Sequence, residues 1–127
     1  MTDRLVHIVD DDPAVRDSLR WLLASADIES RIYETPQAFL AVTGGRPAGC
    51  VLLDMRMPET DGVAVLKSLA RSGMTAAVIV MTGHGDSADA SEALRLGAAD
   101  FIEKPFSAER LLAAIDRALG RPDSTPR

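Results

Sequence analysis

Residues 5–13, which read LVHIVDDDP, join a short run of apolar and β-branched residues directly to three acids and a proline. Short, uninterrupted apolar runs are typical of strands that are buried on both faces, as in a parallel sheet. Pro13 suits the first turn of a helix, and Asp12 is a good N-cap for it. The stretch therefore predicts a buried strand, a sharp acidic turn and a helix in immediate succession.

The same alternation continues along the chain. Apolar runs predict strands at residues 50–53, 77–81 and 99–102, and residues 28–33 predict a more polar strand, nearer an edge of the sheet. A segment with apolar residues at helical spacing follows each of these strands. Ser107 is expected to open the last helix. Residues 55–60 are expected to form a loop, and Trp21, on the first helix, is expected to be partly buried. Strands that alternate with helices in this way predict an α/β fold with a parallel sheet.

Length and composition limit the class of protein. The chain has 127 residues, a formal net charge of −5, 46% hydrophobic residues and one cysteine. This length suits a single domain, and one cysteine excludes a disulfide framework and a cysteine-rich zinc site. The acidic balance argues against direct nucleic-acid binding by this segment. No stretch approaches the roughly 18–20 apolar residues of a membrane span, and no secretory leader is evident, so we expect a cytoplasmic domain without membrane contact.

Charged and hydroxyl side chains follow most of the predicted strands. They are Asp10, Asp11, Asp54, Thr82 and Lys104. The carboxyl ends of parallel strands share one edge of a sheet, so these side chains are expected to lie together. Two carboxylates about 4 Å apart repel by roughly 4 kcal/mol at an effective dielectric near 20. Lys104 supplies one compensating charge, and a divalent ion with oxygen ligands, best matched by Mg²⁺, would supply the rest.

Such a site is suited to phosphoryl transfer. A carboxylate beside a metal can attack a phosphoryl donor and form an aspartyl phosphate. Asp54 is the best nucleophile candidate because it stands alone at the end of a very apolar, central strand. Lys104 and Thr82 would contact the phosphoryl oxygens, while Asp10 and Asp11 would hold the metal.

Several motifs, taken in order, resemble those of the response-regulator receiver domain. They are VDD at 9–11, LDMRMP at 53–58 with DG at 61–62, MTG at 81–83 and FIEKPF at 101–106. The resemblance covers essentially residues 4–119. The stretches 6–11, 82–86 and 100–106 are similar to the nitrogen-fixation regulator (FixJ-type) subfamily in particular. We expect residues 1–120 to form the receiver and residues 121–127 to be a tail or the start of a linker.

The resemblance implies a flavodoxin-like, doubly wound (βα)5 fold with strand order 2-1-3-4-5. It also implies that a bacterial sensor histidine kinase of a two-component system phosphorylates Asp54. Mg²⁺ would be held by Asp11, Asp54 and the backbone carbonyl of Arg56, with Asp10 acting through water. On this basis the chain is not a turnover enzyme, although it would catalyse its own phosphorylation and dephosphorylation.

The resemblance further implies a switch. Thr82 and Phe101 would form the switch pair, and the Lys104–Pro105 peptide would be cis, which is accessible because proline follows. Phosphorylation would change the face formed by the fourth helix, fifth strand and fifth helix and promote homodimerisation there. The subfamily also implies a helix-turn-helix output domain, used in transcription regulation, outside this segment.

Three other functions remain open. A flavodoxin-type cofactor binder shares the fold, but it needs a phosphate cradle where this chain has three acids. An aspartate-nucleophile phosphohydrolase would have a second acid two residues after Asp54, and Arg56 occupies that position. The third is a receiver-fold docking module that works without phosphorylation.

Overall fold

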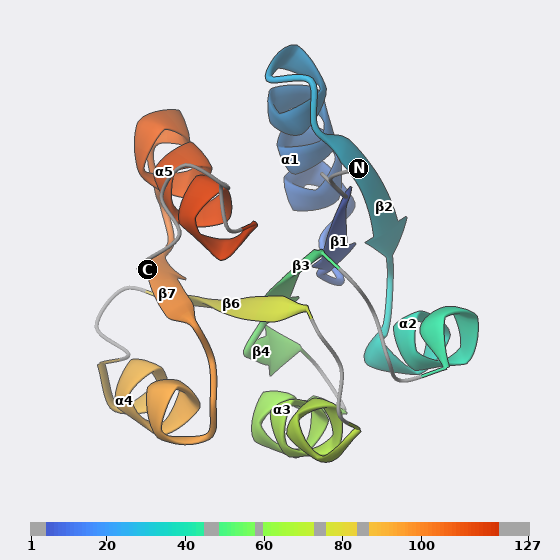
Figure 1. The fold of residues 1–127 in the computed structure, drawn as a ribbon, viewed down its shortest axis with the longest axis vertical. Helices are drawn as coiled ribbons and strands as arrows, with labels where there is room; N and C mark the ends of the chain where they lie inside the picture. Colours follow the sequence, from blue (N-terminus) through green and yellow to red (C-terminus); the bar gives the residue numbers. More distant parts are fainter. Residues whose placement is uncertain (1–4, 45–48, 58–59, 73–75, 84–86, 120–127) are drawn as a thin grey trace, which may run out of the picture.

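Five parallel strands form the central sheet of the computed structural model, which describes residues 5–44, 49–57, 60–72, 76–83 and 87–119 (Figure 1). The strands are β1 (Leu5–Val9), β2 (Glu29–Tyr33), β3 (Cys50–Asp54), β6 (Ala77–Thr82) and β7 (Asp100–Glu103). They lie side by side in the order β2-β1-β3-β6-β7. If the five strands of this sheet are numbered 1 to 5 along the chain, their spatial order is 2-1-3-4-5. The predicted flavodoxin-like α/β fold is therefore confirmed.

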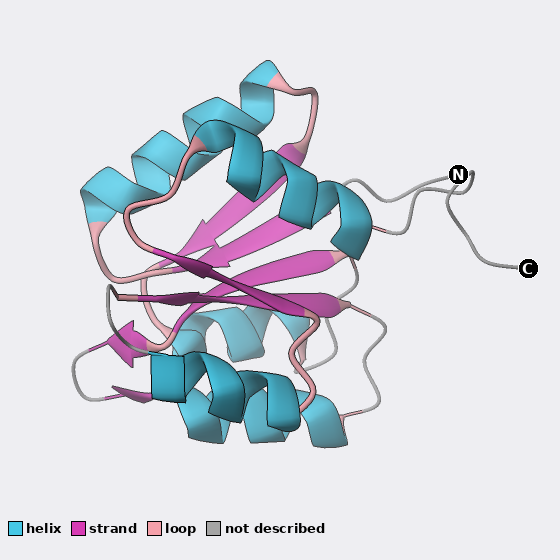
Figure 2. Ribbon diagram, turned by 90° about the vertical axis from the view of Figure 1, so that its left-hand side faces the viewer, coloured by secondary structure: helices cyan, strands magenta, loops and turns pink. Residues whose placement is uncertain are grey.

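Helices cover both faces of the sheet (Figure 2). They are α1 (Pro13–Ser25), α2 (Pro36–Thr43), α3 (Gly62–Arg71), α4 (Ser87–Arg95) and α5 (Ala108–Ala118). Side chains of α1 and α5 share one hydrophobic core with the sheet, and side chains of α2, α3 and α4 share the other. Among the described residues, no helix is long and apolar enough to cross a membrane.

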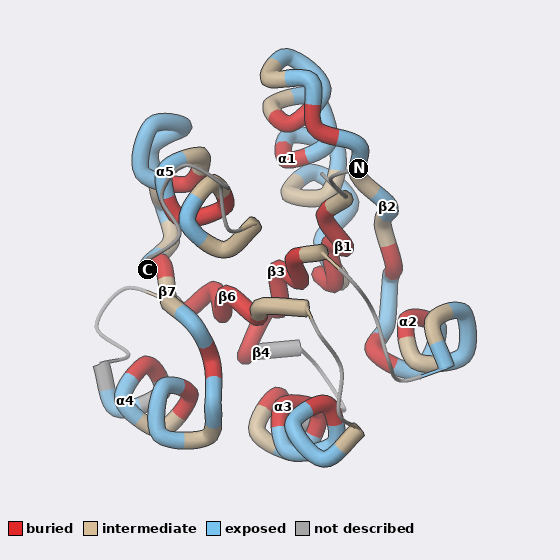
Figure 3. Tube along the Cα trace, viewed as in Figure 1, coloured by how far each residue is buried: buried red, intermediate tan, exposed pale blue. Residues whose placement is uncertain are grey.

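The central strands are mostly apolar, as expected for strands that helices cover on both faces. All five residues of β3 are buried (Figure 3). Val51 and Leu53 belong to one core, whereas Cys50 and Leu52 belong to the other, as the period-two alternation of a strand requires. The edge strand β2 mixes exposed and buried residues, in agreement with its more polar sequence.

Capping side chains and a glycine determine where three helices begin, near the carboxyl edge of the sheet. The Asp12 side chain accepts a hydrogen bond from the Ala14 amide and caps α1, and Ser107 caps α5 through the Arg110 amide. Gly62, at the start of α3, lies against the backbone of Met55, so a Cβ there would come within 2.9 Å of it. This close approach brings α3 against the residue that follows Asp54.

Two expectations about local structure are wrong. Residues 55–60 do not form a simple loop, because β4 (Arg56–Met57) pairs antiparallel with β5 (Thr60–Asp61). Strands of two residues are too short to leave a periodic pattern in the sequence. Trp21 is 77% exposed rather than partly buried. It lies two residues, or about 200° of helical rotation, from the buried Leu19 and Leu23, and so faces away from the core.

Candidate functional site

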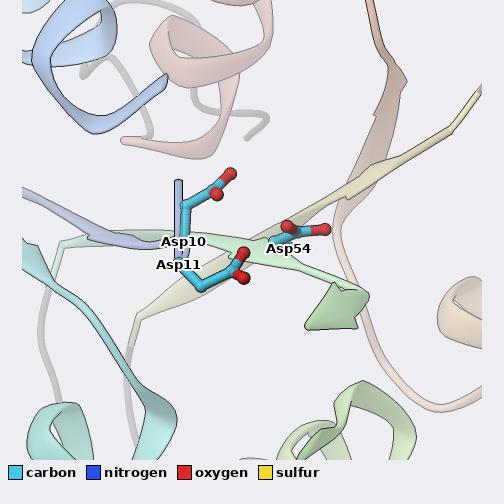
Figure 4. Close-up of side chains that lie close together, drawn as sticks. All are labelled: Asp10, Asp11 and Asp54. Carbon is cyan, nitrogen blue, oxygen red and sulfur yellow. The ribbon is translucent and has the colours of Figure 1, made fainter. Parts of the chain in front are cut away.

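Three acids meet at the carboxyl edge of the sheet (Figure 4). Asp10 and Asp11 directly follow β1, and Asp54 ends β3. The two strands are neighbours, with Val9 opposite Leu53, so the residues that follow them are brought together. One carboxylate oxygen from each acid lies within 4.8 Å of the others. The strand ends therefore assemble the acidic cluster that the sequence predicts.

Lys104 lies between two of these carboxylates. Its Nζ is 2.9 Å from Oδ2 of Asp10 and 3.4 Å from Oδ2 of Asp54, across 94 and 50 residues of sequence. The backbone amide of Lys104 donates to the Thr82 carbonyl at 2.7 Å, which extends the pairing of β6 with the segment after β7. The Lys104–Pro105 peptide is cis.

The surroundings keep Lys104 charged. Burial alone lowers the pKa of the ammonium group, but the hydrogen bond to Asp10 and the charges of Asp54 and Asp10 outweigh burial and raise the pKa above its ordinary value. A fixed cation therefore faces the acidic cluster at neutral pH.

The two adjacent acids occupy different environments. Asp10 is fully buried, and its Oδ1 accepts a hydrogen bond from the Asp12 amide at 3.0 Å. Its Oδ2 is bound by Lys104. Asp11 is only partly buried. Asp10 is thus a structural anchor with both oxygens engaged, whereas Asp11 has access to solvent at the mouth of the cluster.

Thr82 and Phe101 lie on adjacent strands. Thr82 ends β6, is buried, and directs its Oγ1 to the Ile102 carbonyl at 3.4 Å. Phe101, in β7, is half-buried against the core on the side of α3 and α4. Its amide donates to Oδ1 of Asp100 at 2.8 Å. The two residues of the predicted switch pair are therefore close in the sheet, and their role remains a prediction.

The proposed carbonyl ligand comes from the short strand pair. Arg56 lies in β4, opposite Asp61 of β5, immediately after Asp54 and Met55. Its place as a metal ligand remains a prediction.

Sequence reasoning missed Arg16 at this site. Its guanidinium donates to the backbone carbonyl of Asp10 at 2.8 Å. A signal exists, because helical side chains lean toward the N-terminus of their helix, and Arg16 stands in the first turns of α1. Nothing local, however, identifies which carbonyl the side chain would reach.

The donor set fits a hard divalent ion. Among the described residues, the cluster presents carboxylate oxygens of Asp10, Asp11 and Asp54, and Mg²⁺ binds through one or two carboxylates while keeping several waters. Soft metals would need thiolate or imidazole ligands. Asp54, with one oxygen against Lys104, is also a carboxylate nucleophile held next to a cation.

Comparisons with known proteins agree with this arrangement. The family model of the response regulator receiver domain matches residues 6–116. The chain is 47% identical over 116 residues to the transcriptional regulatory protein FixJ of Azorhizobium caulinodans, covering 91% of this chain and 55% of that protein. It is 45% identical over 114 residues to FixJ of Bradyrhizobium diazoefficiens, covering 90% of this chain and 56% of that protein.

A solved structure of FixJ-N is similar with a TM-score of 0.86 and 38% identity, covering 100% of this chain and 99% of that chain. The chain spans about half the length of the curated FixJ relatives that it matches. The family match over most of the chain and the order of the strands lead to the same conclusion: the chain belongs to the response regulator receiver domain family.

Proposed function

We propose that this chain is the phosphoacceptor domain of a two-component response regulator, and that Asp54 accepts the phosphoryl group of a sensor histidine kinase. The observation that carries the proposal is the position of Lys104, whose ammonium lies 2.9 Å from Asp10 and 3.4 Å from Asp54. A cation held there neutralises a nucleophilic carboxylate and is available to the oxygens of an incoming phosphoryl group.

The reaction forms one bond and breaks one. An oxygen of the Asp54 carboxylate attacks phosphorus, the P–N bond to the kinase histidine breaks, and its electron pair returns to the imidazole nitrogen. A bound Mg²⁺ would offset charge on the phosphoryl oxygens. Asp11, Asp54 and the Arg56 carbonyl would hold this ion, with Asp10 acting through water. The group stays on the protein as an aspartyl phosphate, so the chain acts as a signal carrier and not as a turnover enzyme.

The same proposal includes an output. Thr82 would exchange its long hydrogen bond to the Ile102 carbonyl for one to a phosphoryl oxygen, and Phe101 would turn further inward. The face formed by α4, β7 and α5 would then change shape and favour a homodimer. Relatives named transcriptional regulatory proteins support a role in transcription regulation. A helix-turn-helix output domain outside the receiver of residues 1–120 would carry that role, with residues 121–127 as a tail or the start of a linker. A partner kinase of this class would place the domain in the cytoplasm.

Intact-mass spectrometry tests the phosphoacceptor role. Phosphoramidate is the probe, since it presents the same type of P–N bond as phosphohistidine. In the presence of Mg²⁺ the wild-type chain is expected to gain one phosphoryl group, and chelation of the metal should abolish the gain. Asp54→Asn should gain none, whereas Asp17→Asn, a change at an exposed acid of α1, should behave as wild type.

Either of two results would overturn the phosphoacceptor role. One is a wild-type chain that gains no mass, which would leave the docking-module alternative. The other is Asp54→Asn gaining as much as wild type. Sedimentation after beryllofluoride treatment tests the dimer separately: a shift to a dimer is expected, and an unchanged monomer would remove that part of the proposal.

A further inference from the structure

We propose that Arg16 is a positioning residue for the metal site: its guanidinium fixes the peptide unit between Asp10 and Asp11 and thereby orients the Asp11 carboxylate. The inference rests on the proposed function, because it assumes that Asp11 binds Mg²⁺. It starts from one contact, the 2.8 Å hydrogen bond that Nη1 of Arg16 donates to the carbonyl oxygen of Asp10.

That carbonyl belongs to the turn on which both acids stand. The amide of Asp10 donates to the Tyr33 carbonyl at 3.3 Å, and its two carboxylate oxygens are bound by the Asp12 amide and Lys104. With the Arg16 bond, both backbone polar groups and both side-chain oxygens of Asp10 are engaged. Asp10 therefore cannot rotate without breaking several hydrogen bonds.

The Arg16 bond reaches beyond Asp10. A peptide unit is planar, so an anchor on the Asp10 carbonyl also sets the direction of the Asp11 amide and the placement of its Cα. Asp11 is the partly buried acid of the cluster, and its carboxylate lies with those of Asp10 and Asp54. Groups that orient metal ligands in this way commonly contribute 10- to 100-fold to metal affinity.

Arg16 is itself held firmly enough to act as an anchor. Its amide makes the first helical hydrogen bond of α1, to the Asp12 carbonyl at 3.0 Å. Leu19 and Leu23 bury the same helix against the sheet. The partly buried guanidinium therefore joins a rigid helix to the turn that carries the acids.

A second role for Arg16 predicts the opposite effect on the metal. If the guanidinium acted only as a positive charge near the cluster, it would repel Mg²⁺, and its removal would tighten binding. If it orients Asp11, its removal loosens binding. The sign of the change in the Mg²⁺ dissociation constant separates the two roles.

Isothermal titration of the whole chain with MgCl2, at constant ionic strength, measures that sign. Arg16→Met keeps the aliphatic stem and removes the donors, and it is expected to weaken Mg²⁺ binding about tenfold. Arg16→Lys keeps a charged donor and should recover much of the affinity. Arg20→Met is the matched control, because Arg20 lies one turn later on α1, is exposed, and pairs with Asp17. The Mg²⁺ affinity of Arg20→Met should equal that of the wild-type chain.

The outcomes are distinct. Equal or tighter Mg²⁺ binding by a folded Arg16→Met overturns the inference and leaves the proposed function standing. No Mg²⁺ binding by the wild-type chain overturns the metal-dependent function, and the inference with it. Circular dichroism checks folding, and if Arg16→Met does not fold, Arg16→Gln replaces it with the same expected sign.

Discussion

Helices α4 and α5 pack against the same two strands, β6 and β7, from opposite faces of the sheet, but they are attached in different ways. On α5, Leu111 and Ile115 are fully buried. On α4, the buried side chains among those that the structure describes are Ala90 and Ala93. A helix held by alanines loses little apolar contact when it shifts, whereas one held by leucine and isoleucine loses much.

Polar contacts add to the difference between α4 and α5 in how firmly each helix is attached to the sheet. Arg117 binds Oδ2 of Asp100 at 2.9 Å, and Arg110 binds Oδ1 of Asp100 at 3.5 Å and the Phe101 carbonyl at 2.8 Å. These contacts tie α5 to β7. The ion pair described on α4, between Glu92 and Arg95, stays within that helix. Polar side-chain contacts thus tie α5 to β7, whereas the ion pair described on α4 does not reach β7, so we expect α4 to shift more easily than α5.

The largest expected difference is in stability. Leu111→Ala should lower the free energy of unfolding by about 2–5 kcal/mol, because it leaves a cavity in a fully buried position. Ala93→Gly should lower it by about 1 kcal/mol, mainly through helix propensity. Urea unfolding followed by far-ultraviolet circular dichroism measures both, since the exposed Trp21 is a poor fluorescence reporter. Equal losses at the two sites would contradict the difference in anchoring.

Amide hydrogen exchange tests the same difference without mutation. We expect the central amides of α4 to exchange about tenfold faster than those of α5, because regions with few buried apolar contacts open more readily. Beryllofluoride should alter exchange in α4 more than in α5 if the proposed switch is correct. Slower exchange in α4 than in α5 would show that the small alanine contacts are sufficient to hold it.

The contacts of Asp100 with Arg110 and Arg117 should make a smaller contribution to the free energy of unfolding, and this contribution should depend on pH. Partial burial alone raises the pKa of Asp100, but hydrogen bonds from the Phe101 amide, Arg117 and Arg110 outweigh burial and lower the pKa below its ordinary value. A lowered carboxyl pKa stabilises the fold above the unfolded value, near pH 4, and this contribution is lost as the pH falls through the folded value. Asp100→Asn should therefore reduce stability at pH 7 by about 1 kcal/mol, after allowance for solvent screening.

Denaturant unfolding from pH 7 to pH 3 measures this effect. The difference between wild type and Asp100→Asn is expected to shrink below about pH 4. Arg95→Ala, which removes the exposed pair within α4, should leave stability unchanged at each pH. A difference between wild type and Asp100→Asn that is constant across the range would show that the charge of Asp100 is not what holds α5.

Much of the fold and of the acidic cluster could be predicted because the decisive signals are local. Each central strand is an apolar run, and the runs before Asp10 and Asp54 end abruptly in acids. Parallel pairing then forces these ends to one edge. The sequence does not predict the strand pair β4–β5, because strands of two residues are too short to show a period. The exposure of Trp21 does not follow from its residue type, because an aromatic residue does not by itself identify the face of a helix.

The sequence alone determines the succession of strands and helices along the chain, the caps at Asp12 and Ser107, and the chemical type of each site residue. These features depend on neighbours within a few residues. Only tertiary packing determines the contacts between distant segments at the site. It brings Lys104 against carboxylates 94 and 50 residues away, buries Asp10 more deeply than Asp11, and directs Arg16 to the turn between them. These contacts join distant segments, and their distances arise only when the helices settle on the sheet.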